Sequence, residues 1–147
     1  MCHNPVNCPR RLALAQPGDM DDFGQELAHS LGRHGGLIPL AELQARLLVP
    51  AAADMGPWLQ RRGLRRLAWR AQQWVPAFQL AADGLTPRAD VAAVADELPV
   101  ALDELGILAW FAQPNLMLDG EPPVACLDAR LPAVLEAARL EYFLVSG

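Results

Sequence analysis

Residues 63–84 read GLRRLAWRAQQWVPAFQLAADG, and this stretch decides the fold. Leu67 and Trp69 alternate with polar or small neighbours, and a second alternation covers residues 74–80. A period of two is typical of strands, so we predict a β-hairpin here, with a turn that has neither glycine nor asparagine. We expect Pro76 to lie on a sheet edge, because proline has no N–H to give to the ladder.

Upstream of this stretch, the spacing of apolar residues is that of helices. We predict three helices, over residues 19–34, 39–47 and 54–63. The order helix, turn, helix, two-stranded ribbon predicts a winged helix-turn-helix-like unit over residues 19–84. The prolines and glycine of residues 1–18 predict an irregular N-terminal tail.

Downstream of Gly84 the period is helical to the end of the chain. Prolines and caps divide this part into four predicted helices, over residues 86–98, 103–113, 122–127 and 132–144. We therefore predict a mainly α protein, with a small winged helix-turn-helix-like N-terminal unit that contains a β-hairpin. An α-helical C-terminal domain over residues 85–147 follows it.

The composition limits the chemistry that the chain can perform. The 147 residues suit one domain or two small ones, and 52% of them are apolar, which is enough for a buried core. There is no lysine, and the only hydroxyl residues apart from one tyrosine are Ser30, Thr86 and Ser146. A lysine Schiff base is therefore excluded, and a serine or threonine nucleophile has few places to lie. We expect no enzyme activity and no cofactor.

Charge is distributed unevenly along the chain. Residues 47–80 carry five arginines and one acidic residue, whereas residues 81–147 carry three arginines and eleven acidic residues. The five arginines of the first segment, called the basic block below, fall at the end of the second helix of the helix-turn-helix and along the ribbon. Because guanidinium groups bind phosphate and guanine with paired hydrogen bonds, they are candidate DNA contacts: Arg61, Arg62, Arg65, Arg66 and Arg70.

A solvated basic face that balances the acidic segment is the alternative interpretation of the basic block. The expected reading helix begins with Ala51-Ala52-Ala53-Asp54, which offers no side chain suited to base edges and includes a carboxylate that phosphate would repel. The unit could therefore serve packing or dimerisation instead of DNA binding.

Tryptophans and metal-ligating residues give weaker signals. Trp58, Trp69 and Trp74 could stack on bases, but packing within the hairpin is the favoured interpretation. A metal set could be assembled from Cys2, His3, Cys8, His29 and His34. Its spacings match no common zinc pattern, so we expect no metal site.

Residues 74–127 hold the most specific pattern in the sequence. The segment WVPAFQL (74–80) is followed by LAWF (108–111), by QPN (113–115) and by LDGEPP (118–123). In order and spacing these segments resemble the toxin-binding C-terminal domain of the Xre/MbcA/ParS antitoxin family. The residues that match the family motif are Trp110, Pro114, Asn115, Leu118, Gly120 and Pro123.

The resemblance implies a helical domain that binds and blocks a toxin, typically a RES-domain enzyme that consumes NAD. It also implies an N-terminal helix-turn-helix that represses the protein's own operon. The last helix and tail are the candidate partner surface, with Arg139, Tyr142, Phe143, Leu144 and Val145. Packing of this tail on its own domain is the alternative.

These observations predict a cytoplasmic, non-enzymatic antitoxin-type regulator that neutralises a protein partner and can also repress transcription. We expect a homo-oligomer with no membrane association, because the apolar runs are far shorter than the roughly 20 residues of a membrane-spanning helix. Two alternatives stay open: a DNA-binding regulator without a toxin partner, and a stand-alone inhibitor or adaptor that has lost DNA binding.

Overall fold

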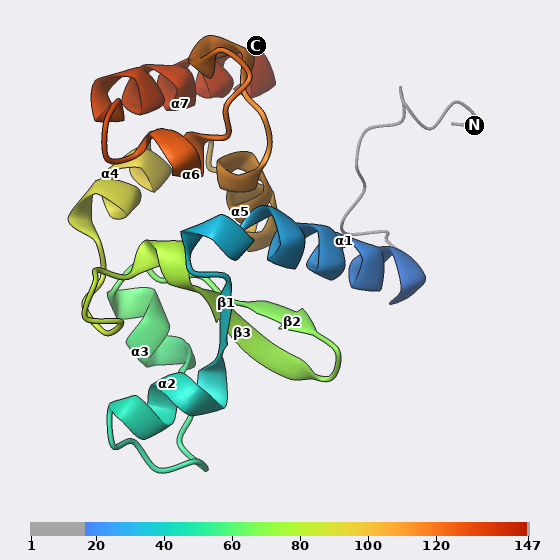
Figure 1. The fold of residues 1–147 in the computed structure, drawn as a ribbon, viewed down its shortest axis with the longest axis vertical. Helices are drawn as coiled ribbons and strands as arrows, with labels where there is room; N and C mark the ends of the chain where they lie inside the picture. The colour runs from blue at the N-terminus through green and yellow to red at the C-terminus, as the bar shows by residue number, and fades with distance from the viewer. Residues whose placement is uncertain (1–16, 147) are drawn as a thin grey trace.

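The structure is a computed structural model that describes the backbone of residues 17–146 and the side chains of residues 22–143. It is mainly helical, with one small antiparallel sheet (Figure 1). Of the expected N-terminal tail, residues 1–16 lie outside the described residues, and Pro17 already begins the first helix.

The first half of the chain contains short helices and all three strands. In chain order its elements are α1 (Pro17–Ser30), the 3₁₀ turn η2 (Gly32–His34), β1 (Leu37–Pro39), α2 (Leu40–Arg46), α3 (Gly56–Arg61), β2 (Leu67–Trp69), β3 (Gln72–Pro76) and the 3₁₀ turn η3 (Ala77–Gln79). The second half is helical throughout. Its elements are α4 (Ala89–Glu97), α5 (Glu104–Ala112), the 3₁₀ turn η4 (Leu116–Leu118), α6 (Pro123–Cys126) and α7 (Leu131–Ser146).

The sheet has three strands rather than the two expected. Its order is β1-β3-β2, and both pairings are antiparallel. Strand β1 was not predicted, because three residues are too few to display a period of two. Pro39 is the last residue of β1 and the N-cap of α2, whereas we expected it in the first turn of that helix.

The central strand ends earlier than the alternation indicated. β3 stops at Pro76, and the chain then turns through η3 instead of continuing as a strand to residue 80. Pro76 therefore terminates the central strand, which corrects its expected place on an edge. At the end of the strand, the missing N–H of Pro76 does not remove a hydrogen bond from the interior of the sheet.

The two faces of the sheet pack against different helices. Ile38 and Val75 are register partners on one face, and they join a small core with α2 and α3 that also contains Leu43, Met55 and Leu59. Figure 1 shows α2 and α3 at one end of the molecule, with α4, α5, α6 and α7 gathered at the other.

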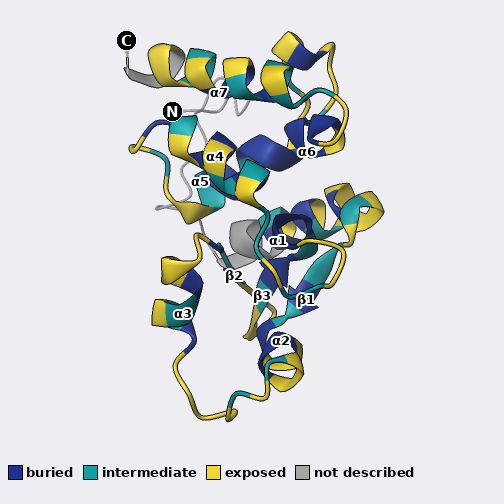
Figure 2. Cartoon of the chain, turned by 90° about the vertical axis from the view of Figure 1, so that its left-hand side faces the viewer, coloured by how far each residue is buried: buried dark blue, intermediate teal, exposed yellow. Residues whose placement is uncertain are grey.

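Leu67 lies on the opposite face and belongs to a large core. Its other members include Leu27 and Leu31 of α1, Phe78 of η3, Val91 and Val94 of α4, Leu108 and Phe111 of α5, and Val134 and Ala138 of α7. Helix α1 thus packs between the sheet and α5, and the buried sides of the helices face inward in Figure 2. The large core contains residues from both sides of residue 84, where we placed the boundary between the two units. That boundary stays a prediction.

Candidate functional site

The basic block extends along one continuous segment of the structure. Arg61 ends α3 and Arg62 is its C-cap, while Arg65 and Arg66 lie in the connection to β2. Arg70 occupies the turn between β2 and β3. Figure 1 shows this hairpin pointing away from α3, so the turn does not lie beside the helix. The five arginines therefore form an extended strip and not one compact cluster.

Helix α3 differs from the expected reading helix. It begins at Gly56, so Ala51, Ala52 and Ala53 lie outside it, and the carboxylate of Asp54 accepts a hydrogen bond from the Gly56 N–H at 2.9 Å. Its residue Gln60 is exposed, whereas Leu59 is buried. Glutamine is a side-chain type that can bond base edges, and Gln60 was not among the expected candidates because only residues 51–54 were considered there.

Two guanidinium groups of the basic block lie over tryptophan rings. The Cζ atom of Arg62 is 4.1 Å from the ring centroid of Trp58, and that of Arg70 is 4.4 Å from the ring centroid of Trp69. Cation–π contacts hold a guanidinium flat while its N–H edges stay available to an anion. In this way the tryptophans preorganise two cations at the surface.

The connection between α3 and β2 is fixed by a buried glutamine. Gln79 is 2% exposed, and its side chain bonds both the N–H and the carbonyl oxygen of Arg65. The Arg65 guanidinium in turn donates to the Gly63 carbonyl oxygen at 3.0 Å. The backbone that carries Arg65 and Arg66 is therefore held to η3.

The tryptophans do not form one platform. Trp69 and Trp74 pack against each other with ring centroids 5.6 Å apart, and Trp74 Nε1 donates to the Trp69 carbonyl oxygen. Both pack against the large core, whereas Trp58 packs against the small one. This geometry agrees with the packing interpretation of the pair at Trp69 and Trp74.

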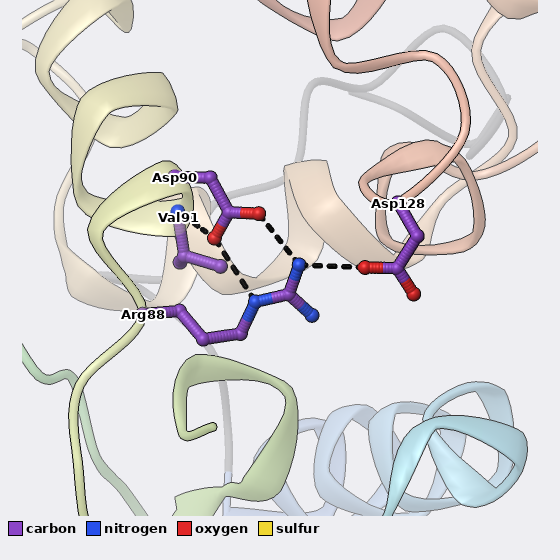
Figure 3. A network of polar contacts seen from close by, with 4 residues as sticks. All are labelled: Arg88, Asp90, Val91 and Asp128. Atoms are coloured by element: carbon purple, nitrogen blue, oxygen red, sulfur yellow. Dashed lines mark hydrogen bonds and ion pairs between the residues drawn. The ribbon is translucent and has the colours of Figure 1, made fainter. Parts of the chain in front are cut away.

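Charge pairing separates the basic block from the other arginines of the described region except Arg33, which also forms no ion pair there. Ion pairs join Arg46 to Glu42, Arg88 to Asp90 and Asp128 (Figure 3), Arg130 to Asp119, and Arg139 to Glu97 and Glu136. Within residues 22–143, no arginine of the basic block forms an ion pair with a carboxylate. The positive charge of this strip is thus not neutralised by the described part of the chain.

The six residues of the antitoxin motif lie around α5, η4 and α6. Trp110 is buried in the large core, and Leu118, the last residue of η4, is fully buried there as well. The Asn115 side chain caps η4 by accepting from the Met117 N–H at 2.9 Å. Gly120 has φ of 83°, and Pro123 is buried at the start of α6. Pro114 is exposed between α5 and η4.

The candidate partner residues lie on α7. Arg139 links α7 to α4 through Glu97, and its hydrogen bonds to Glu136 and Glu97 raise the pKa of its guanidinium. Tyr142 and Phe143 are 47% and 69% exposed and meet edge to face, with centroids 5.8 Å apart. The side chains of Leu144 and Val145 lie outside the described residues.

Metal-ligating residues do not gather in the described region. No group of three histidine, cysteine, aspartate or glutamate side chains there could hold a metal ion. Cys2, His3 and Cys8 of the candidate metal set lie outside the described residues.

Comparison of the chain with protein-family models, with curated proteins and with solved structures gave no match. None of the helices in the described part of the chain has the length and apolar character needed to cross a membrane.

Proposed function

We propose that this chain is a two-sided regulator, which binds DNA through its basic N-terminal unit and a protein partner through its C-terminal helices. The observation that carries the proposal is the strip of arginines along α3 and the hairpin, which have no carboxylate partner within residues 22–143. The element order α1-β1-α2-α3-β2-β3, with a β1-β3-β2 sheet, supports a winged helix-turn-helix unit. The resemblance to antitoxins supports a toxin as the protein partner.

The arginines suit phosphate contacts. Arg62 and Arg70 are exposed and preorganised on tryptophan rings, and the hairpin carries Arg70 away from α3. We expect the two groups to bind separate phosphates of one duplex, while Gln60 on α3 is the candidate for a base edge. Phosphate contacts supply affinity without sequence preference, so specificity depends on the few side chains that reach bases.

Salt dependence tests the DNA-binding half of the proposal. Affinity for the duplex upstream of the protein's own gene is measured by fluorescence anisotropy at a series of salt concentrations. The double variant Arg62→Ala/Arg70→Ala is expected to flatten the slope of log K against log [salt] by about 2, or about 0.9 for each lost phosphate contact. The control Arg46→Ala/Arg130→Ala removes equal charge from arginines that are already ion-paired.

Unchanged slope in the control supports contact by the strip itself. Equal flattening in both double variants would show that only net charge matters. Absence of salt-sensitive binding in the unmodified protein would overturn the DNA-binding half and leave the stand-alone inhibitor or adaptor.

The exposed aromatic pair on α7 supports protein binding. Large aromatic side chains near the centre of an interface often carry much of the binding energy, and Phe143 is one of the most exposed apolar residues in the described region. We propose that Tyr142, Phe143 and Arg139, with Leu144 and Val145 beyond them, contact a RES-type toxin that consumes NAD. The protein itself would act by covering the toxin and not by catalysis.

Co-expression with a RES-type toxin from the same host tests this half. The unmodified protein is expected to restore cellular NAD and growth, and Phe143→Ala is expected to weaken the complex at least tenfold. Val100→Ala is the matched control, because Val100 is 98% exposed and lies outside α7. Full rescue by Phe143→Ala would overturn the proposed partner surface, and absence of any complex would overturn the antitoxin function.

A further inference from the structure

The connection between α2 and α3 is an exposed apolar loop. Its residues 47–53, called the apolar loop below, read LLVPAAA, so none of their side chains carries a charge or a hydrogen-bonding group. The exposed members are Leu48, Pro50, Ala51, Ala52 and Ala53. Figure 1 places the loop at the end of the molecule opposite α7, and Figure 2 shows it exposed along most of its length. A contiguous exposed apolar surface is typical of protein–protein contact sites.

Leu48 occupies a position where glycine is the usual residue. It is 90% exposed, follows the C-cap Leu47 of α2 and has φ of 58°, in the left-handed region. The Leu48 N–H donates to the Ala45 carbonyl oxygen at 3.1 Å, and the Val49 N–H donates to the Gln44 carbonyl oxygen at 2.9 Å. These two bonds form a Schellman motif, in which glycine avoids the steric penalty of a Cβ. The chain therefore holds a leucine both in an unfavourable backbone conformation and in water.

The apolar loop is held in place by the side chain of Gln44. This side chain is 8% exposed, and its Nε2 donates to the carbonyl oxygens of Pro50 at 3.2 Å and of Ala53 at 3.4 Å. The Ala53 N–H also donates to the Pro50 carbonyl oxygen at 3.0 Å. The residues on either side of Leu48 pack against the small core. The exposure of Leu48 is thus fixed by the structure of the loop and does not result from a loose connection.

The distribution of charge favours a second copy of the chain as the partner. A twofold contact places each surface against its own copy, so a charged surface faces like charge and an uncharged one does not. Residues 81–147 carry eleven acidic residues and three arginines, and their helices lie at the end of the molecule away from the apolar loop (Figure 1). Two copies joined through the loop therefore keep their acidic halves as far apart as the shape of the chain allows.

We propose that the apolar loop is a self-association surface, through which two copies of the chain meet around a twofold axis with Leu48 as the anchor of each copy. Burial of Leu48 in the contact removes its apolar surface from water, which compensates for its unfavourable backbone conformation. One leucine, one proline and three alanines per copy are far fewer than the roughly 20–30 residues per side of a standard stable interface, so the dimer is transient. This association does not depend on the DNA or toxin binding proposed above.

Sedimentation equilibrium of the full chain tests the proposal at protein concentrations from about 20 μM to about 1 mM. A reversible monomer–dimer equilibrium is expected. Association should be stronger at about 500 mM salt than at about 50 mM, because salt screens the repulsion between two copies of like net charge. Contact between the basic block of one copy and the acidic helices of another would instead weaken with salt. A monomer throughout this range, or a dimer that salt dissociates, would overturn the proposal.

Two matched substitutions locate the contact. Leu48→Ala is expected to weaken dimerisation at least about tenfold, because each dimer loses two buried leucine side chains. Leu116→Ala is the control, because Leu116 is 95% exposed and lies in η4, away from the apolar loop. Equal effects of the two substitutions, or undiminished dimerisation of Leu48→Ala, would overturn the assignment of the loop.

Leu48→Gly separates association from folding. Glycine suits the left-handed conformation at this position, so the thermal unfolding midpoint of the dilute protein should rise while dimerisation is lost. A lower midpoint would show that the leucine side chain serves the fold of its own chain, and it would overturn the proposal. Retained dimerisation of this variant would overturn it as well.

Discussion

The side-chain amide of Gln79 bonds the backbone of Arg65 at both ends, accepting from its N–H at 2.9 Å and donating to its carbonyl oxygen at 2.8 Å. A third bond reaches the Pro76 carbonyl oxygen. The buried side chain of Gln79 thus makes the two hydrogen bonds that a neighbouring strand could make with Arg65. It joins the connection between α3 and β2 to the end of the sheet.

Gln79→Leu should lower the free energy of unfolding by about 2–3 kcal/mol, because two buried backbone groups lose their partners. Urea denaturation of the full chain measures this loss. Gln73→Leu is the control at an exposed glutamine of β3, and it should stay within about 0.5 kcal/mol of the unmodified protein. A loss at Gln79 no larger than at Gln73 would contradict the role of this link.

Gly24→Ala should separate α1 from β2. A Cβ at Gly24 would lie 2.3 Å from the indole Cδ1 of Trp69, so helix and ring would both have to move. Overpacking of this kind costs about 1–3 kcal/mol. Gly32→Ala adds the same methyl group where nothing lies within 4 Å, and it should be tolerated. Thermal unfolding of the two variants distinguishes these cases.

Ala71→Gly should raise the thermal unfolding midpoint. Arg70 and Ala71 both have positive φ, 52° and 61°, which is the geometry of a type I′ turn that favours Asn-Gly. Removal of the Cβ relieves an unfavourable left-handed conformation, for a net gain of about 0.5–1 kcal/mol. Ala68→Gly, in the extended strand β2, should lower the midpoint instead. An Ala71→Gly protein less stable than the unmodified one would contradict this account of the turn.

Asp83 should titrate well below an ordinary aspartate. Hydrogen bonds from the Thr86 side chain, the Thr86 N–H and the Leu85 N–H lower the pKa of its carboxyl from 3.8 to about 2. A lowered pKa in the folded state means that this stabilisation is complete above pH 4 and is lost as the pH falls toward 2. Carboxyl NMR titration should show the low pKa, and Thr86→Val should move it back toward 3.8. A pKa near 3.8 in the unmodified protein would contradict the prediction.

The helices were predictable where apolar residues repeat on one face over several turns. Val91, Val94 and Leu98 identify α4, and Leu105 and Leu108 identify α5, because side chains spaced three or four apart share a helix face. The prolines at 99, 114 and 123 also ended or began elements close to where they were expected.

The sheet was harder to predict because its critical residues are few. Leu37 and Ile38 carry too short a pattern to indicate a strand, and β1 exists only because β3 pairs with it. The alternation across Phe78 and Leu80 resembled a strand, yet both residues are buried around a 3₁₀ turn that Gln79 holds by its side chain. Long-range hydrogen bonds, and not the local spacing of apolar residues, determine the backbone structure of these segments.

The arginines of the basic block were predictable as a group, but not their arrangement. Arg66 and Arg70 are close in sequence, but the extended strand β2 lies between them and separates them in space. The direction of the hairpin follows from the pairing of β3 with β1. The stacking of Arg62 on Trp58 depends on the place where α3 ends, which the composition of the segment does not reveal.

Leu27 and Leu31 share the large core with residues of α4, α5, α6 and α7, and this limits how the chain can be cut or fused. A C-terminal fragment that starts after Gly84 would lack α1 and Phe78, and would expose the apolar surfaces of α4 and α5 that they cover. Such a fragment should aggregate or bind α1 supplied as a separate peptide. A transplant of the C-terminal helices into another protein should therefore bring the first helix along.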